Sequence, residues 1–130
     1  MDKYPWLEKE LLGYPGACTD YKAEWKWERY LVNEKMFAAV CQPGPEYPAY
    51  GGRKMIILKG DPMESELLRK EYPDIIPGFY SDKSHWNSVY LDGEVPDELL
   101  KHLCTQSYRL VFEKLTKKVQ RQILEQSNHL

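Results

Sequence analysis

A long amphipathic segment near the C-terminus constrains the fold of this chain more than any other feature. Pro96 opens the segment, acids occupy its first turn, and large apolar side chains then recur at a helical spacing of about 3.6 residues. The stripe comprises Leu99, Leu100, Leu103, Cys104, Ser107, Tyr108, Val111, Phe112 and Leu115. A helix over 96–115 with so broad a stripe needs a large apolar partner, and we expect it to lie across a β-sheet.

The N-terminal half supplies candidate strands for that sheet. Residues 25–32 alternate large apolar with charged side chains, which is typical of a strand with one solvent-facing side. Asn33 and Glu34 separate this strand from a second one at 35–40, which predicts a tight hairpin. Asn tolerates a positive φ at the first turn position but Glu does so poorly at the second, so we expect a longer or strained turn.

A second helix is expected to begin at Asp61. Asp61 can cap it, Pro62 suits the first helical position, and Glu64 can reach back to complete a capping box. The buried face of this helix is predicted to consist of Leu67, Leu68 and Tyr72.

Shorter signals place the other elements. We expect a helix over 5–12, an irregular Pro- and Gly-rich loop over 42–52, strands over 54–59, 79–80 and 86–91, a short helix over 119–124 and a frayed tail over 125–130. This order predicts an α+β fold: one domain over 1–130, with an antiparallel sheet backed by N- and C-terminal helices.

Composition narrows the class of protein. The net charge of −2 gives no general attraction to nucleic acid or to anionic membranes. No apolar run approaches the roughly 20 residues that span a bilayer, and the N-terminus lacks an apolar signal segment. We therefore expect a cytoplasmic protein without a membrane partner, with a monomer as the favoured state. Cys18, Cys41 and Cys104 are odd in number and scattered, which favours free thiols over disulfides or zinc.

The segment richest in recognition chemistry is 78–93, where aromatics, a His, a Lys and an Asn lie between two glycines. If 83–87 protrudes as a wing between two strands, Lys83 and His85 would contact phosphates while Asn87 reaches a base edge. Trp86 would fill a groove of the DNA or the hydrophobic core. Two alternatives stay open: Trp86 as a core residue, and Asn87 as the cap of a turn.

Further cations could extend a DNA-binding surface. Arg69 and Lys70 lie late in the second helix, and a second group comprises Lys114, Lys117, Lys118 and Arg121. The alternative for both groups is that the cations complement the negative end of a helix dipole.

Signs of catalysis or of a metal site are weak in this sequence. Ser84 and His85 are adjacent, so in a strand they would point to opposite faces and could not relay a proton. The nucleophile-elbow, zinc-protease, P-loop and dinucleotide-binding motifs are missing from the sequence. Its acidic groups are interrupted by lysines or explained by helix capping. We therefore expect no enzyme, no cofactor and no metal.

Several segments together resemble the MmcQ/YjbR family of small bacterial proteins. They occur in family order within about residues 25–120: 35–38, 58–62, 72–80, 83–93 and 107–111. The resemblance implies a frataxin-like (CyaY-like) α+β fold and, for function, only the proposal that members bind double-stranded DNA. Two positions depart from the family pattern: Glu34 stands where Gly is usual, and Gly60 where Cys is common.

Two functions therefore remain, and they predict different surfaces. Binding of double-stranded DNA, favoured by the resemblance, requires a continuous positive face. A protein-interaction module, built from the aromatic hairpin 79–91 and the loop residues Tyr47 and Tyr50, requires an exposed apolar patch instead. Burial of His85 and Trp86 would weaken both hypotheses.

Overall fold

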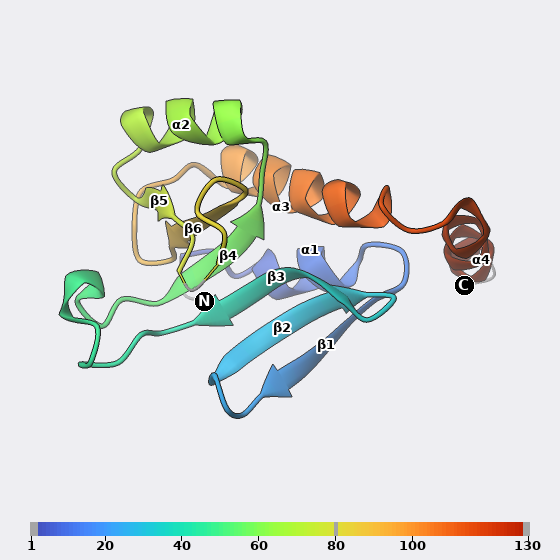
Figure 1. Cartoon of the computed structure of the whole chain (residues 1–130), viewed down its shortest axis with the longest axis horizontal. Coiled ribbons are helices and arrows are strands. Elements are labelled where there is room, and N and C mark those ends of the chain that lie inside the picture. Colours follow the sequence, from blue (N-terminus) through green and yellow to red (C-terminus); the bar gives the residue numbers. More distant parts are fainter. Residues whose placement is uncertain (1–2, 80, 129–130) are drawn as a thin grey trace.

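The computed structural model describes residues 3–79 and 81–128 (Figure 1). Within them, six strands form one sheet in the order β1-β2-β3-β4-β6-β5, and every neighbouring pair is antiparallel. The elements are α1 (Leu7–Leu12), β1 (Ala17–Lys22), β2 (Trp27–Val32), β3 (Lys35–Cys41), the 3-10 turn η1 (Pro48–Tyr50), β4 (Met55–Lys59), α2 (Pro62–Glu71), β5 (Ile75–Pro77), β6 (Trp86–Tyr90), α3 (Asp97–Phe112) and α4 (Lys117–Asn128). The predicted single-domain α+β fold is confirmed.

Helices cover one face of the sheet. α1 and α3 lie behind the strands in Figure 1, and α3 packs against β2, β3 and β4, as its apolar stripe predicts. The main core lies between these layers and includes Leu100, Leu103 and Cys104 from α3. We call this side of the sheet the covered face.

Side chains alternate between the covered face and the opposite side, which we call the open face. In β4, Ile56 and Leu58 join the main core, whereas Met55 and Ile57 belong to a second cluster on the open face. In β3 the alternation is interrupted at Phe37, which the register of β2 with β3 leaves without a partner residue. Phe37 is therefore the extra residue of a β-bulge, and it turns its ring into the main core.

The predicted hairpin between β2 and β3 is tight, and its turn is strained. Val32 pairs directly with Lys35, so only Asn33 and Glu34 form the turn. Their φ angles are +48° and +65°, and the second is unfavourable for a residue with a side chain such as Glu.

The predicted start of α2 is largely confirmed. An Asp61 carboxylate oxygen accepts a hydrogen bond from the backbone N–H of Glu64 at 3.0 Å. The Glu64 carboxylate turns to α3 and accepts from Nε2 of Gln106 at 3.0 Å. The predicted burial of Leu67 is wrong, because this side chain is 66% exposed, while Leu68 packs against the main core.

Two strand predictions need correction. The edge strand β1 (Ala17–Lys22) was not predicted, because its side chains are mostly exposed and backbone pairing with β2 holds it in place. A strand over 79–80 is wrong for Phe79, which lies in a turn, and Tyr80 is outside the described residues. The strand at this point of the sheet is β5, four residues earlier in the sequence.

The C-terminal helix is longer than predicted. α4 continues to Asn128, so the predicted frayed tail is wrong as far as that residue, and 129–130 lie outside the described part. α4 sits beyond the C-terminal end of α3, at the far side of the molecule from α2 (Figure 1). α4 comes close to Gly16 through Ile123. Gly16 has a φ of +71°, and a Cβ added there would lie 2.9 Å from a methyl carbon of Ile123.

Candidate binding groove on the open face of the sheet

The predicted wing at 83–87 is a turn held by contacts within the chain. Nδ1 of His85 lies 2.7 Å from a carboxylate oxygen of Asp82, and the backbone N–H of Ser84 donates to the other oxygen at 2.9 Å. The contact with His85 lowers the pKa of Asp82, followed by the bond from Ser84. His85 is exposed, but its ring is already paired with a carboxylate.

Asn87 is buried, which corrects the prediction that it reads a base edge. Only 4% of the residue is exposed. Its Oδ1 accepts from Nε of Arg69 at 2.8 Å, and its Nδ2 donates to Oγ of Ser65 at 2.7 Å. The amide is therefore part of the packing between α2 and β6.

Arg69 and Lys83 direct their charges to carbonyl oxygens of the chain itself. Nη2 of Arg69 donates to the carbonyls of Lys83 at 2.6 Å and Trp86 at 3.1 Å. Nζ of Lys83 donates to the carbonyl of Gly78 at 3.0 Å. These two cations stabilise the turn. The sequence had predicted contacts with phosphates for them and not this structural role.

The other predicted cations are exposed, and most lie elsewhere on the molecule. Lys70 is exposed on α2. Lys114 follows α3 and lies close to Lys59, whose pKa is lowered by burial and then by the Lys114 ammonium. Lys117, Lys118 and Arg121 are exposed on α4. Lys114 thus lies beside Lys59, which pairs with Trp86 in the sheet, whereas α4 stands at the far side of the molecule from α2 (Figure 1).

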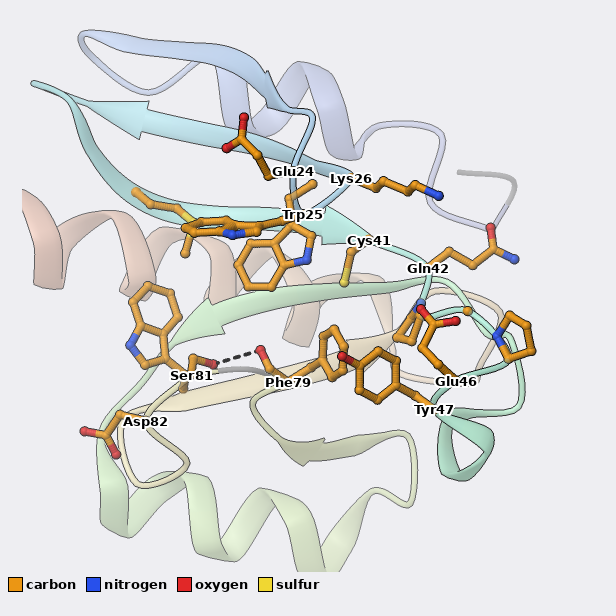
Figure 2. Close-up of a pocket in the computed structure, with 16 residues that line it drawn as sticks. Glu24, Trp25, Lys26, Cys41, Gln42, Glu46, Tyr47, Phe79, Ser81 and Asp82 are labelled. Atoms are coloured by element: carbon orange, nitrogen blue, oxygen red, sulfur yellow. Dashed lines mark hydrogen bonds between the residues drawn. The ribbon is translucent and has the colours of Figure 1, made fainter.

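The open face carries a cavity of about 920 Å³, which we call the aromatic groove (Figure 2). Apolar side chains from five separate segments line it: Trp25, Trp27, Met36, Tyr47, Phe79 and Trp86. Its volume lies within the usual range of about 300–1,000 Å³ for ligand sites. Trp25 is exposed, Trp27 and Phe79 are buried, and Met36, Tyr47 and Trp86 are half-buried, so the groove is a hollow with one exposed ring at its edge.

Trp25 stands at the groove on the turn that joins β1 and β2. The turn is closed by a backbone hydrogen bond from Trp25 to Lys22 at 3.1 Å, and Lys26 has a φ of +59°. The Trp25 ring packs edge-on against Trp27, with centroids 5.3 Å apart, and Nζ of Lys22 lies 5.4 Å from its centre. The side chain nevertheless remains 55% exposed.

Phe79 joins the groove's separate walls. Its ring centroid lies 5.1 Å from Tyr47, 5.0 Å from Tyr50 and 6.4 Å from Trp27. Its backbone N–H donates to Oγ of the buried Ser88 at 3.0 Å. The 42–52 loop, the segment after β5 and strand β2 therefore meet at one aromatic ring.

An ion-pair cluster holds Arg53, the residue that follows this loop. The Arg53 guanidinium lies 3.7 Å from the centre of the Tyr90 ring. Its Nη2 donates to Asp92 at 2.7 Å and to Asp74 at 3.0 Å. The hydrogen bond from Arg53 lowers the pKa of Asp92.

The groove holds more acidic than basic side chains. Among its lining residues the acids are Glu24, Glu46 and Asp82, and the only base is Lys26. Cys41 also lines the groove, but burial raises the pKa of its thiol to about 12, so the reactive thiolate is disfavoured near neutral pH. Glu24 pairs with Nζ of Lys22 at 3.1 Å and Asp82 pairs with His85, so the groove offers apolar contact with Glu46 at its edge.

Sequence reasoning found part of this groove. It singled out the 79–91 hairpin together with Tyr47, and the structure brings these residues together. It missed Trp25, Trp27 and Met36, although two tryptophans of one strand segment, spaced by two residues, were a signal that one strand face is unusually aromatic.

Among residues 3–79 and 81–128, no group of three or more His, Cys, Asp or Glu side chains is arranged to hold a metal ion. No helix among the same residues is long and apolar enough to cross a membrane.

Sequence comparisons point to one family. The family model described as YjbR matches residues 12–110. The chain is 35% identical over 104 residues to the uncharacterized protein YjbR of Escherichia coli K12, covering 77% of this chain and 82% of that protein. It is also 35% identical over 107 residues to the uncharacterized protein YbdF of Escherichia coli O157:H7, covering 72% and 88%. The names of these relatives assign no activity.

Solved structures share the architecture. The crystal structure of Deinococcus radiodurans protein DR2400, described by the domain DUF419, matches with a TM-score of 0.76 and 29% identity over 90% of this chain and 84% of that one. A protein from Pseudomonas syringae matches with a TM-score of 0.67 and 22% identity over 78% and 92%, which supports the fold alone. The resemblance to the frataxin fold stays a prediction.

Proposed function

The chain belongs to the YjbR family, and from this premise we propose that it is a non-enzymatic binding protein whose aromatic groove receives a peptide segment of a protein partner. It acts as a monomer in the cytoplasm. The observation that carries the proposal is the half-exposed Trp25, held at a groove that already contains four other aromatic rings.

Exposed tryptophan is costly to leave in water, and Trp and Tyr are enriched among the residues that dominate binding energy. Here the ring is fixed by the turn, by Trp27 and by Lys22, so little side-chain entropy remains to be lost when a partner binds. The positive φ of Lys26 strains the backbone of this turn, and such strain is concentrated at functional sites.

A selection from a library of random 12-residue peptides displayed on phage tests the proposal. We expect enriched peptides to bind the wild type and to lose at least about tenfold in affinity to the Trp25→Ala variant. Tyr21→Ala is the matched control, because Tyr21 is an equally exposed aromatic, 60% accessible, on neighbouring β1 and outside the groove lining. Failure to enrich any peptide, or unchanged affinity in Trp25→Ala, would contradict the proposal.

Binding of double-stranded DNA is the second candidate, and the basic surface at the end of α3 supports it. Lys59 and Lys114 lie close enough to repel each other, and Lys117, Lys118 and Arg121 follow on exposed α4. Such a cluster can neutralise phosphates in spite of the net charge of −2.

A labelled random duplex of about 25 base pairs, titrated by anisotropy at 50 and 200 mM salt, tests this candidate. We expect binding that weakens at high salt and that Lys117→Ala with Lys118→Ala reduces. Lys83→Ala with His85→Ala is the contrasting variant, which should also reduce binding if the predicted wing contributes. Absence of binding at 50 mM salt would exclude the candidate.

A further inference from the structure

We infer that the occupant of the aromatic groove is a proline-rich segment that carries arginine or lysine, bound in the polyproline II conformation. The inference rests on the proposed peptide-binding function and names the chemistry of the partner. Three features of the groove support it: its position on the sheet, the form of its walls and the charge of its rim.

The position of the groove argues against recognition by strand addition. Its sheet residues come from β2, β3 and β6, and each of these strands lies between two neighbours. Their backbone N–H and C=O groups are therefore used within the sheet, and a guest strand would find no open edge there. A polyproline II segment suits this surface, because its backbone stays solvated and it needs few hydrogen bonds from its host.

The walls of the groove are aromatic pairs packed edge to face. Trp25 and Trp27 form one pair at 5.3 Å, and Tyr47 and Phe79 form another at 5.1 Å. Proline rings dock on grooves lined by such aromatics, and the guest is already stiff before it binds, which limits the entropy lost. Figure 2 shows Trp25, Tyr47 and Phe79 gathered around the hollow.

The rim offers one carboxylate to a positively charged guest. Glu24 already pairs with Nζ of Lys22 at 3.1 Å and Asp82 with Nδ1 of His85 at 2.7 Å, whereas Glu46 lies beside Tyr47 at the edge of the groove (Figure 2). An arginine of the guest can pair with Glu46 and stack its guanidinium on a tryptophan ring. A guest with acidic residues would meet repulsion instead.

The test compares labelled 12-residue peptides by fluorescence anisotropy with the purified protein. The first has proline at two of every three positions and two arginines. The second replaces both arginines by glutamate, and the third replaces every proline by alanine. We expect a Kd of about 10–100 μM for the first peptide and at least about tenfold weaker binding for the other two. Trp25→Ala should weaken the first peptide at least tenfold, and Tyr21→Ala should leave it unchanged.

Each other result contradicts the inference, one part of it, or the proposed function as well. If peptides selected from the random library bind the groove while the proline–arginine peptide does not, this inference fails and the proposed function stands. If neither kind binds, both fail. Equal affinity for the arginine and glutamate peptides would overturn the charge selection. Sedimentation that changes from dimer to monomer in Trp25→Ala would identify a second copy of the chain as the occupant and overturn the inference.

Discussion

The two faces of the sheet solve the same problem, the burial of apolar side chains, by different means. On the covered face, helices supply long aliphatic and aromatic side chains, and the core residues there are almost wholly inaccessible, as Leu100 and Ile56 are. On the open face, no α-helix of the described residues covers the second cluster, and loops deliver Tyr47, Tyr50 and Phe79 instead.

The difference shows how a binding surface can arise without loss of the fold. A helix covers a sheet continuously, whereas separate loops meet at a few rings and leave space between them. The covered face then carries most of the stability, and the open face can keep Trp25 half exposed at small cost. Four experiments test this division of roles.

Leu100→Ala should have the largest effect. The side chain is fully buried in the main core, and its removal should destabilise the folded state by about 2–5 kcal/mol. Urea unfolding followed by circular dichroism measures the change. Leu67→Ala on the exposed side of α2 is the control, with an expected change within about 0.5 kcal/mol. A loss for Leu100→Ala below about 1 kcal/mol would show that the covered face does not dominate stability.

Arg69→Ala tests the contact of α2 with β6 and with the turn that precedes it. The change leaves the buried Oδ1 of Asn87 without its donor and releases the carbonyls of Lys83 and Trp86, so we expect a loss of about 1–3 kcal/mol. Lys70→Ala, the adjacent exposed residue, should change stability by less than about 0.5 kcal/mol. Equal effects of the two variants in urea unfolding would mean that Arg69 does not brace the turn.

Trp25→Ala should separate binding from stability. Because the ring is 55% exposed, we expect the free energy of unfolding to fall by no more than about 1 kcal/mol, although peptide binding is lost. Thermal unfolding and anisotropy on the same sample measure both. A loss of several kcal/mol would instead make Trp25 a core residue of the open face.

Acid should weaken the open face slightly through Asp92. Its pKa is lowered in the folded state by Arg53, so the stabilisation is complete above the unfolded-state pKa of about 3.9 and is lost as the pH falls through the folded value. Asp92→Asn should therefore show a smaller decrease in urea midpoint between pH 6 and pH 3 than the wild type. An identical decrease in both proteins would assign the acid sensitivity to other carboxylates.

Local signals predicted the parts of this fold that local chemistry determines. The spacing of apolar residues in α3 and the Asp61 cap of α2 are properties of a few neighbouring residues, and both are confirmed. β1 escaped prediction because nothing in its exposed side chains requires a strand, and only pairing with β2 creates it.

The candidate site also combines features visible in a short stretch of sequence with features that depend on long-range contacts. The aromatic density of 79–91 was visible in the sequence, but the burial of Asn87 depends on Ser65 and Arg69, which are 22 and 18 residues away. The second wall of the groove depends on Trp25, which the fold brings to Phe79 across 54 positions of sequence. Contacts of this kind have no signature in a short window.

Gly16 allows the C-terminal helix α4 to pack close to the chain because glycine has no side chain. The space that a methyl group would fill is occupied by Ile123, so a Gly16→Ala variant would act as a wedge and push α4 outward. The cations of α4 would move with it relative to Lys59 and Lys114. The position of the basic surface thus depends on the absence of a side chain at Gly16, just before β1. Gly16 precedes the cations of α4 by about a hundred residues.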